Sequence, residues 1–232
     1  MTERSVPGFL PSRNGFHFAN RWPAGPALWL GGGSIRLGIG NAADGLCGGM
    51  CFTVRDRFDA RLSVPVDGTP PPAGTPLFAE IVRRQVDSLD RLIRLPLRFW
   101  RLAALHPDPP TRLTRALGLT PRGVLTLRDE WPRLRAVIDS GRLAMVGLVR
   151  STSRSPLLLG RHHQVLAWGY RVSAAELALR IYDPNWPDRD DVKLVARLDL
   201  DPTTGRQRVT LAQSTGEPLL GWFLAPFIPT RR

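Results

Sequence analysis

The hydrophobic pattern of the chain changes its period at Gly141. Before this residue, apolar side chains recur every three or four positions, which is the spacing of helices that bury one face. The predicted helices cover residues 47–58, 77–95, 98–105 and 127–140. After Gly141, short apolar runs alternate with Gly and Pro turns, which predicts strands at residues 144–150, 164–170, 177–182, 192–200, 208–212 and 219–225. Helices followed by an antiparallel sheet make an α+β fold.

Two other stretches lack a helical period. The first 40 residues are rich in Gly, Pro and aromatic residues, and we interpret them as loops with short strands at residues 27–30 and 34–37. Residues 64–76, VPVDGTPPPAGTP, are a proline-rich loop, and Pro76 opens the helix that follows. A chain of 232 residues with 43% hydrophobic content is long enough to bury one sizeable core.

The formal charge of +12 invites a nucleic-acid interpretation, but its distribution does not favour one. Lys193 is the only lysine, and the arginines are scattered along the chain with Asp or Glu near many of them. Blocks of like charge and alternating basic and aromatic residues are both missing from the sequence. We therefore expect no specific nucleic-acid binding, while an acidic partner or surface stays open.

The sequence holds no apolar run near the roughly 20 residues that cross a bilayer, so we expect no membrane span. The first residues, MTERSVPGFLPSRNG, lack the apolar region of a secretory signal. We expect a cytoplasmic protein, with export by a signal-less route as the alternative. The pattern indicates no oligomeric state.

Both cysteines lie in one glycine-rich stretch, NAADGLCGGMCF, at residues 41–52. Cys47 and Cys51 stand one turn apart on a predicted helix, where their side-chain directions fit a disulfide poorly. A zinc site is disfavoured because the spacing is not C-x-x-C and because the adjacent His162 and His163 rarely bind one metal together. We expect no metal and no cofactor, which leaves thiol chemistry or plain burial.

Cys47, His163 and Asp183 stand at the ends of predicted elements. Cys47 begins a helix, whose positive end favours the thiolate, as a neighbouring imidazolium would. His163 heads the strand HQVLAWGY and Asp183 ends the next strand, so a hairpin would bring both side chains to the same end. There the carboxylate can orient the imidazole through its second nitrogen. Each residue also has a structural interpretation, as a buried thiol, a polar strand end and a turn residue.

Attack on a carbonyl group needs hydrogen-bond donors for the oxygen that becomes negative. The Cys47 backbone N–H is one such donor, and the side-chain amide of Asn41, six residues upstream, is the candidate for the other. Gly48 and Gly49 are predicted to let a substrate approach the backbone closely. Trp186, close after Asp183, is predicted to contact the substrate and to shield the His–Asp pair from water.

These motifs resemble the papain-like cysteine peptidase superfamily, and most closely its bacteriocin-leader-processing branch. The resemblance rests on Cys47–Gly48 at a helix start, on His163 opening HQVLAWGY, and on Asp183 followed by a proline. The chain as a whole is also similar to a group of bacterial proteins of undetermined activity that share GLCGGM, HQVLAYGY and YDPN. The family has a glutamine six residues before its cysteine, where this chain has the shorter Asn41.

The resemblance implies one papain-like domain over residues 1–232, with a helical lobe over about residues 41–141 and a β lobe over about residues 142–228. It implies a Cys–His–Asp triad that acts on a peptide or protein substrate as a peptidase, or in related acyl transfer or deamidation. The rival hypothesis is a catalytically inactive papain-like binding module.

Two choices between neighbouring residues complete the predicted site. Cys51, which Phe52 follows, is the alternative nucleophile, because the family shows an aromatic residue after its cysteine. We place the nucleophile at Cys47, since it lies nearer the helix start and has an amide six residues upstream. We expect His162 to be exposed, because strand alternation points it away from the face of His163.

Overall fold

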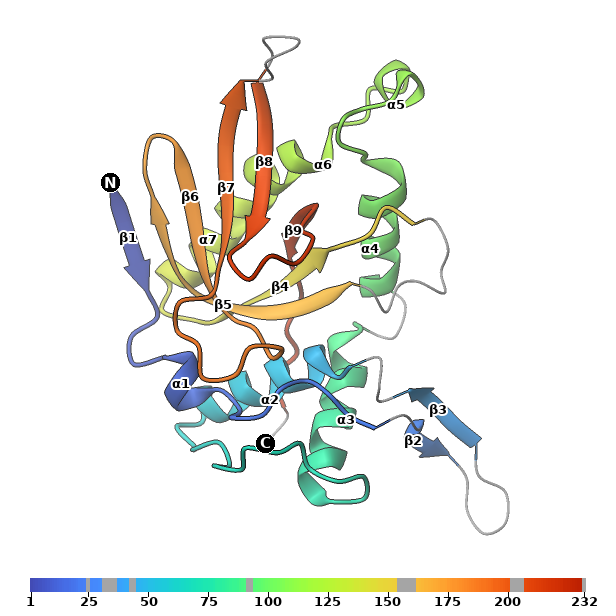
Figure 1. Cartoon of the computed structure of the whole chain (residues 1–232), viewed down its shortest axis with the longest axis vertical. Helices are drawn as coiled ribbons and strands as arrows, with labels where there is room; N and C mark the ends of the chain where they lie inside the picture. The colour runs from blue at the N-terminus through green and yellow to red at the C-terminus, as the bar shows by residue number, and fades with distance from the viewer. Residues whose placement is uncertain are drawn as a thin grey trace.

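The sheet expected after Gly141 forms the centre of the fold. The structure, a computed structural model, describes residues 1–23, 26–30, 37–41, 45–90, 94–153, 162–200 and 207–230. Within these ranges the strands pair antiparallel in the order β8 (Gln207–Gln213), β7 (Lys193–Leu200), β6 (Glu176–Tyr182), β5 (His163–Val172), β4 (Ala144–Val149) and β9 (Gly221–Leu224). The predicted antiparallel sheet is confirmed (Figure 1).

One strand of this sheet, β1 (Thr2–Ser5), was not predicted. It pairs with the second half of β5, from Thr2 opposite Val172 to Ser5 opposite Gly169. Its four residues are exposed, so backbone hydrogen bonds hold it and it leaves no hydrophobic alternation in the sequence. A separate hairpin pairs β2 (Pro26–Leu30) with β3 (Leu37–Asn41). Most of the strand predicted at residues 34–37 lies outside the described residues, and β3 begins where that prediction ends.

In Figure 1, the helices lie below the sheet, behind it and to its right. They are α1 (Pro11–Asn14), α2 (Cys47–Asp59), α3 (Pro76–Ser88), α4 (Arg94–Leu105), α5 (Arg112–Ala116), α6 (Arg122–Leu125), the π-helical turn η2 (Thr126–Glu130) and α7 (Trp131–Asp139). Helix α2 contacts α3 and β5, and α7 contacts β1, β4, β5 and β9. The α+β class is therefore confirmed. None of the helices that the structure describes is long and apolar enough to cross a membrane.

The helix predicted over residues 77–95 is in fact two helices. Helix α3 ends at Ser88 and α4 begins at Arg94, with Asp90 between them in a left-handed conformation, φ 47°. A left-handed residue ends a right-handed helix. The helix predicted over residues 127–140 begins earlier than expected, because α6 and the π turn lead into α7. Pro132 lies just after the π turn and cannot donate to the carbonyl group four residues back.

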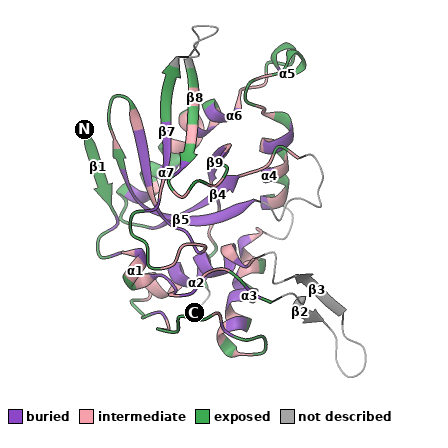
Figure 2. Ribbon diagram, viewed as in Figure 1, coloured by how far each residue is buried: buried purple, intermediate pink, exposed green. Residues whose placement is uncertain are grey.

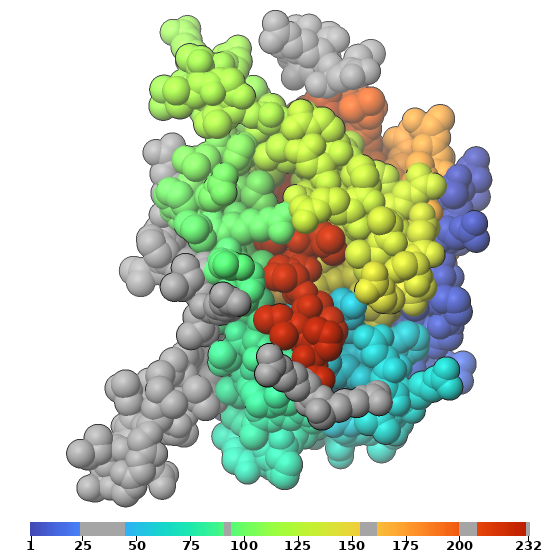
Figure 3. Space-filling view, turned by 180° about the vertical axis from the view of Figure 1, so that it is seen from behind, coloured from blue at the N-terminus to red at the C-terminus, as the bar shows by residue number. Residues whose placement is uncertain are grey.

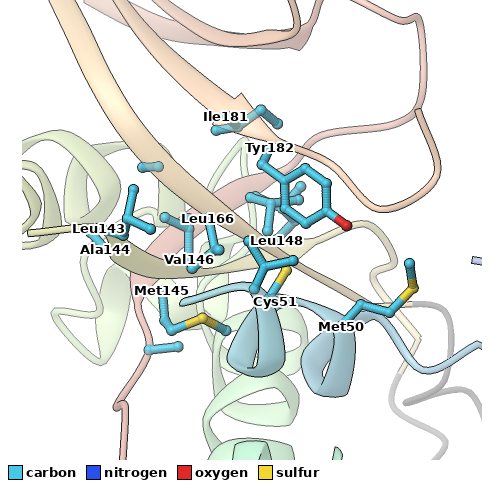
Figure 4. Close-up of a cluster of buried hydrophobic side chains, with 14 of the residues drawn as sticks. Met50, Cys51, Leu143, Ala144, Met145, Val146, Leu148, Leu166, Ile181 and Tyr182 are labelled. Carbon is cyan, nitrogen blue, oxygen red and sulfur yellow. The ribbon is translucent and has the colours of Figure 1, made fainter. Parts of the chain in front are cut away.

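The core lies between the sheet and the helices. Buried residues concentrate on β4, β5 and β6 and on the inner side of α2 (Figure 2). Met50 and Cys51 lie on α2 among these side chains, and Cys51 points toward Leu148 of the sheet (Figure 4). The Cys51 Sγ atom is 3.5 Å from the carbonyl oxygen of Gln164, the second residue of β5. This packing brings the first turn of α2 against the start of β5.

The segment after β9 closes the back of the molecule. It lies across the space between α2, α3 and α7 (Figure 3). Arg84 is buried in α3, pairs with Asp56 of α2 at 2.7 Å, and donates a hydrogen bond to the carbonyl oxygen of Ile228. The guanidinium group of Arg55 stacks over the ring of Phe227 at 3.7 Å. The end of the chain thus contacts both α2 and α3 and helps to hold the two helices together.

Candidate active site

The predicted histidine and aspartate meet at one end of the β5–β6 hairpin. His163 is the first residue of β5, Asp183 directly follows β6, and the pairing of Leu166 with Tyr182 brings the two ends together. The Nε2 atom of His163 is 2.7 Å from the Oδ1 atom of Asp183. The backbone N–H of Asn185 donates to the same oxygen at 2.9 Å. The imidazole is therefore oriented through Nε2.

The third predicted residue, Cys47, reaches this pair from the helical side. It is the first residue of α2, and its thiol group lies close enough to His163 for the charges of the two side chains to shift each other's pKa. Because Nε2 is engaged by Asp183, Nδ1 is the nitrogen left for a contact with the sulfur. The backbone of Gln164 also stabilises the thiolate and so lowers the pKa of Cys47. Cys47 is partly exposed whereas His163 and Asp183 are buried, so Cys47 is the residue of the set that lies nearest the surface.

The electrostatics of the three groups favour a thiolate–imidazolium pair. Burial alone would raise the pKa of the Cys47 thiol, but the His163 imidazolium and the Gln164 N–H outweigh burial and lower that pKa below its ordinary value. Burial alone would lower the pKa of His163, but the Asp183 carboxylate and the Cys47 thiolate raise it to about 9. Both shifts stabilise the state in which the proton has moved from sulfur to nitrogen.

Two residues that we did not predict hold the second oxygen of Asp183. The Nε2 atom of Gln213 donates to Oδ2 at 2.8 Å, and a guanidinium nitrogen of Arg150 lies 3.6 Å from the same oxygen. Arg150 also donates to the Oε1 atom of Gln213 at 2.8 Å. Because arginine can only donate, this contact fixes the Gln213 amide with its NH₂ group toward the carboxylate. Burial would raise the pKa of Asp183, but His163, Asn185 and Arg150 lower it, so the carboxylate stays charged.

The alternative nucleophile, Cys51, lies in the core. Its side chain is fully buried, and burial raises its pKa well above the ordinary value, with the nearby Cys47 thiolate adding to the effect. A thiol that stays protonated is a poor nucleophile. Of the two cysteines, the surroundings of Cys47 are therefore the ones that favour reaction.

The expectation that His162 is exposed was wrong. The residue is 9% exposed, and its ring stacks on that of Phe99 with 4.7 Å between ring centroids. Its Nδ1 atom accepts a hydrogen bond from the backbone N–H of Arg150 at 3.2 Å. Burial, with a smaller effect of Arg122, lowers its pKa to about 4. The strand begins at His163, so strand alternation does not govern His162; it packs instead between the sheet and α4.

The predicted substrate-binding residues occupy different surroundings. Gly48 and Gly49 are buried, and a Cβ atom on Gly48 would lie 2.2 Å from Ser88 Oγ, so close packing against α3 and β5 accounts for both glycines without a substrate. Trp186 is partly buried and its indole N–H donates to the Oε1 atom of Glu217 at 2.6 Å. That bond joins the loop after β6 to the turn after β8. Gln213 is the last residue of β8, directly before this turn. The proposed contact of these three residues with substrate stays a prediction.

Two backbone donors at the start of α2 are occupied by side chains. Asn41 ends β3, and its side chain lies outside the described residues, so its role in stabilising an oxyanion stays a prediction. The backbone N–H of Leu46 donates to Asn20 at 2.6 Å and that of Gly49 to Gln85 at 2.8 Å. The N-cap residue of α2, Leu46, makes no side-chain cap. The backbone N–H groups of Cys47 and Gly48 in the first turn are therefore the candidate donors for a ligand.

Among the residues that the structure describes, no group of three or more His, Cys, Asp or Glu side chains could hold a metal ion. Comparisons of the chain with protein-family models, with curated proteins and with solved structures found no match. What the site can do therefore follows from its own geometry and electrostatics.

Proposed function

We propose that the protein is a papain-like cysteine hydrolase or acyltransferase that uses Cys47, His163 and Asp183. The observations that carry the proposal are the hydrogen bond between His163 Nε2 and Asp183 and the electrostatic effect of His163 on the thiol of Cys47. A nucleophile, a base and a group that orients the base are the three parts that covalent catalysis needs. The lowered pKa of Cys47 and the raised pKa of His163 both favour the reactive ion pair.

The reaction would proceed in two steps. The Cys47 thiolate attacks the carbonyl carbon of the substrate, a C–S bond forms, and the carbonyl oxygen takes the electron pair beside the Cys47 N–H. His163 then gives its proton to the leaving amine as the C–N bond breaks, which leaves a thioester on Cys47. In the second step His163 takes a proton from water, the water attacks the thioester, and the thiolate leaves. With an amine in place of water, the same site performs acyl transfer.

Two features support a papain-like arrangement in particular. The nucleophile begins a helix that packs on the sheet, and the base and its carboxylate partner stand on paired strands of that sheet. A fixed Asp183 on the Nε2 side leaves Nδ1 for the sulfur, which lies on the helical side. We propose a peptide or protein as substrate, with the reaction being hydrolysis, deamidation or acyl transfer.

A thiol-directed electrophile tests the proposal. The native protein should be labelled by a fluorescent iodoacetamide at pH 7, with the label on Cys47 in a peptide map. Labelling should vanish in Cys47→Ala and survive in Cys51→Ala. Turnover of a dye-labelled peptide library should follow the same pattern. A native protein that binds peptides but shows neither labelling nor turnover would be the inactive binding module, and the proposal would fail.

A further inference from the structure

Three segments that are distant in sequence meet beside the proposed nucleophile, and Asn20, which lies on one of them, bonds to the other two. Its Oδ1 atom accepts from the backbone N–H of Leu46, the residue before Cys47, at 2.6 Å. Its Nδ2 atom donates to the Oδ1 atom of Asn185 at 3.2 Å. Its own backbone N–H donates to the carbonyl oxygen of Pro184 at 2.9 Å. One residue thus joins the start of α2 to the loop that follows Asp183.

The bonds to this loop reach the proposed triad in one more step. The backbone N–H of Asn185 donates to the Oδ1 atom of Asp183 at 2.9 Å, and the same oxygen accepts from His163. Asn20 therefore holds the backbone next to Cys47 on one side and the backbone next to Asp183 on the other. The side chain uses its acceptor for the first contact and its donor for the second, which an amide can do and a carboxylate cannot.

The turn before the helix is shaped around this amide. Gly45 has a φ of +90°, a conformation that residues with a side chain rarely adopt. A Cβ atom on Gly45 would lie 2.6 Å from the Nδ2 atom of Asn20. Both the positive φ of the turn and the space taken by the Asn20 amide therefore require a glycine at position 45. The backbone before Cys47 thus approaches Asn20 closely.

Asn20 is itself held firmly, because its neighbours along the chain are anchored in the core. Phe18 and Trp22 are buried on either side of it, with their rings 6.1 Å apart in an edge-to-face arrangement. The indole N–H of Trp22 donates to the carbonyl oxygen of Pro71. His17 pairs with Asp188, which lies on the loop that follows Asp183, at 2.5 Å. An anchored amide can position the two segments that it contacts.

We propose that Asn20 is a positioning residue of the active site, which fixes the nucleophile at the start of α2 relative to the loop that carries Asp183. The inference rests on the proposed function of Cys47, His163 and Asp183. Asn20 acts through the backbone of Leu46 and through Asn185, and it does not take part in the chemistry. If the two side-chain hydrogen bonds of Asn20 are removed, the sulfur of Cys47 and the imidazole of His163 are no longer held in the relative position that their ion pair needs.

The rate of Cys47 alkylation as a function of pH tests this role. Asn20→Ala should slow the alkylation of Cys47 at pH 6–7 by about tenfold and move the midpoint of its pH profile upward, because a small displacement of reacting groups is costly. Asn14→Ala is the matched control, since Asn14 lies in the same segment and its Oδ1 atom accepts from the backbone N–H of Leu10 at 3.0 Å. It should lower the melting temperature without changing the alkylation profile.

A second variant keeps the test decisive if Asn20→Ala does not fold. Asn185→Ala removes the side-chain link to Asn20 but retains the backbone N–H that donates to Asp183. It should also slow alkylation, and adding Asn20→Ala to it should cost less than the sum of the two single changes. Alkylation within about twofold of the native rate in both single variants would overturn the role of Asn20. An ordinary, unshifted pH profile for the native protein would instead overturn the proposed function, so the two failures are distinguishable.

Discussion

The Nε2 atom of His163 lies 2.7 Å from the Oδ1 atom of Asp183, with both side chains buried. A charged carboxylate in a buried site stabilises the imidazolium form of its partner. This contact and the Cys47 thiolate together raise the pKa of His163 to about 9, and the contact leaves the other imidazole nitrogen for the thiol of Cys47. Much of the proposed chemistry depends on this one pair.

Replacing the carboxylate should move the alkaline limit of activity. The active form needs His163 protonated, so activity should fall as the pH rises through about 9 in the native protein. Asp183→Asn removes the charge that raises this pKa, so the fall should begin at lower pH. Activity at the optimum should also drop by on the order of a hundredfold or more. Asp191→Asn, an exposed carboxylate on the same loop that pairs with Arg189, is the control. An alkaline limit that stays in place in Asp183→Asn would contradict the role of this residue.

The two cysteines should react in two separate steps. Cys47 is partly exposed and its pKa is lowered, whereas Cys51 is fully buried and its pKa is raised. An aromatic disulfide reagent at pH 7 should therefore release one equivalent of thiolate rapidly from the native protein. The second equivalent should appear only when urea unfolds the chain. Simultaneous release of both equivalents from folded protein would show that Cys51 is accessible.

His162 should make the protein sensitive to acid. Its pKa is about 4 in the folded protein, below the ordinary value of 6.5, so the unfolded chain binds its proton first as the pH falls. The free energy of unfolding should therefore decrease as the pH falls from about 6.5 to about 4. Below pH 4, His162 should cause no further decrease. His162→Asn, which does not titrate, should give a shallower decrease in urea titrations across this range. An equal slope in both proteins would contradict the buried, neutral His162.

Gly49 should not tolerate a side chain. A Cβ atom there would lie 2.1 Å from the backbone oxygen of Ile81, which cannot move without shifting α3. We expect Gly49→Ala to lower the free energy of unfolding by about 3 kcal/mol, as overpacking does. Gly68→Ala is the control, because no atom lies within 4 Å of its Cβ position, and it should change stability by less than about 0.5 kcal/mol. Equal effects of the two changes in urea denaturation would mean that the helices are not this close.

The parts of the fold that follow from hydrophobic period could be predicted from the sequence. The α2 helix, the hairpin of β5 and β6 and the meeting of His163 with Asp183 all depend on local spacing and on the pairing of neighbouring strands. The break between α3 and α4 could not be predicted, because the apolar spacing continues through it. It depends on the left-handed conformation of Asp90.

The supporting polar contacts could not be predicted either. Gln213 and Arg150 reach Asp183 from the ends of β8 and β4, and Asn20 reaches Leu46 from the first segment of the chain. These residues have no spacing or motif that relates them to the triad, since only the assembled fold brings them together. His162 was misplaced because strand alternation was applied one residue before the strand begins.

The pH dependence of Cys47 alkylation, compared between the native protein and His163→Asn, tests the central claim most directly. We predict that the native thiol reacts with a midpoint below the ordinary thiol pKa of 9. In His163→Asn, burial is no longer opposed by the imidazolium, so the midpoint should rise to 9 or above. A native midpoint at or above 9, or one that His163→Asn leaves unchanged, would contradict the thiolate–imidazolium pair and the catalytic function built on it.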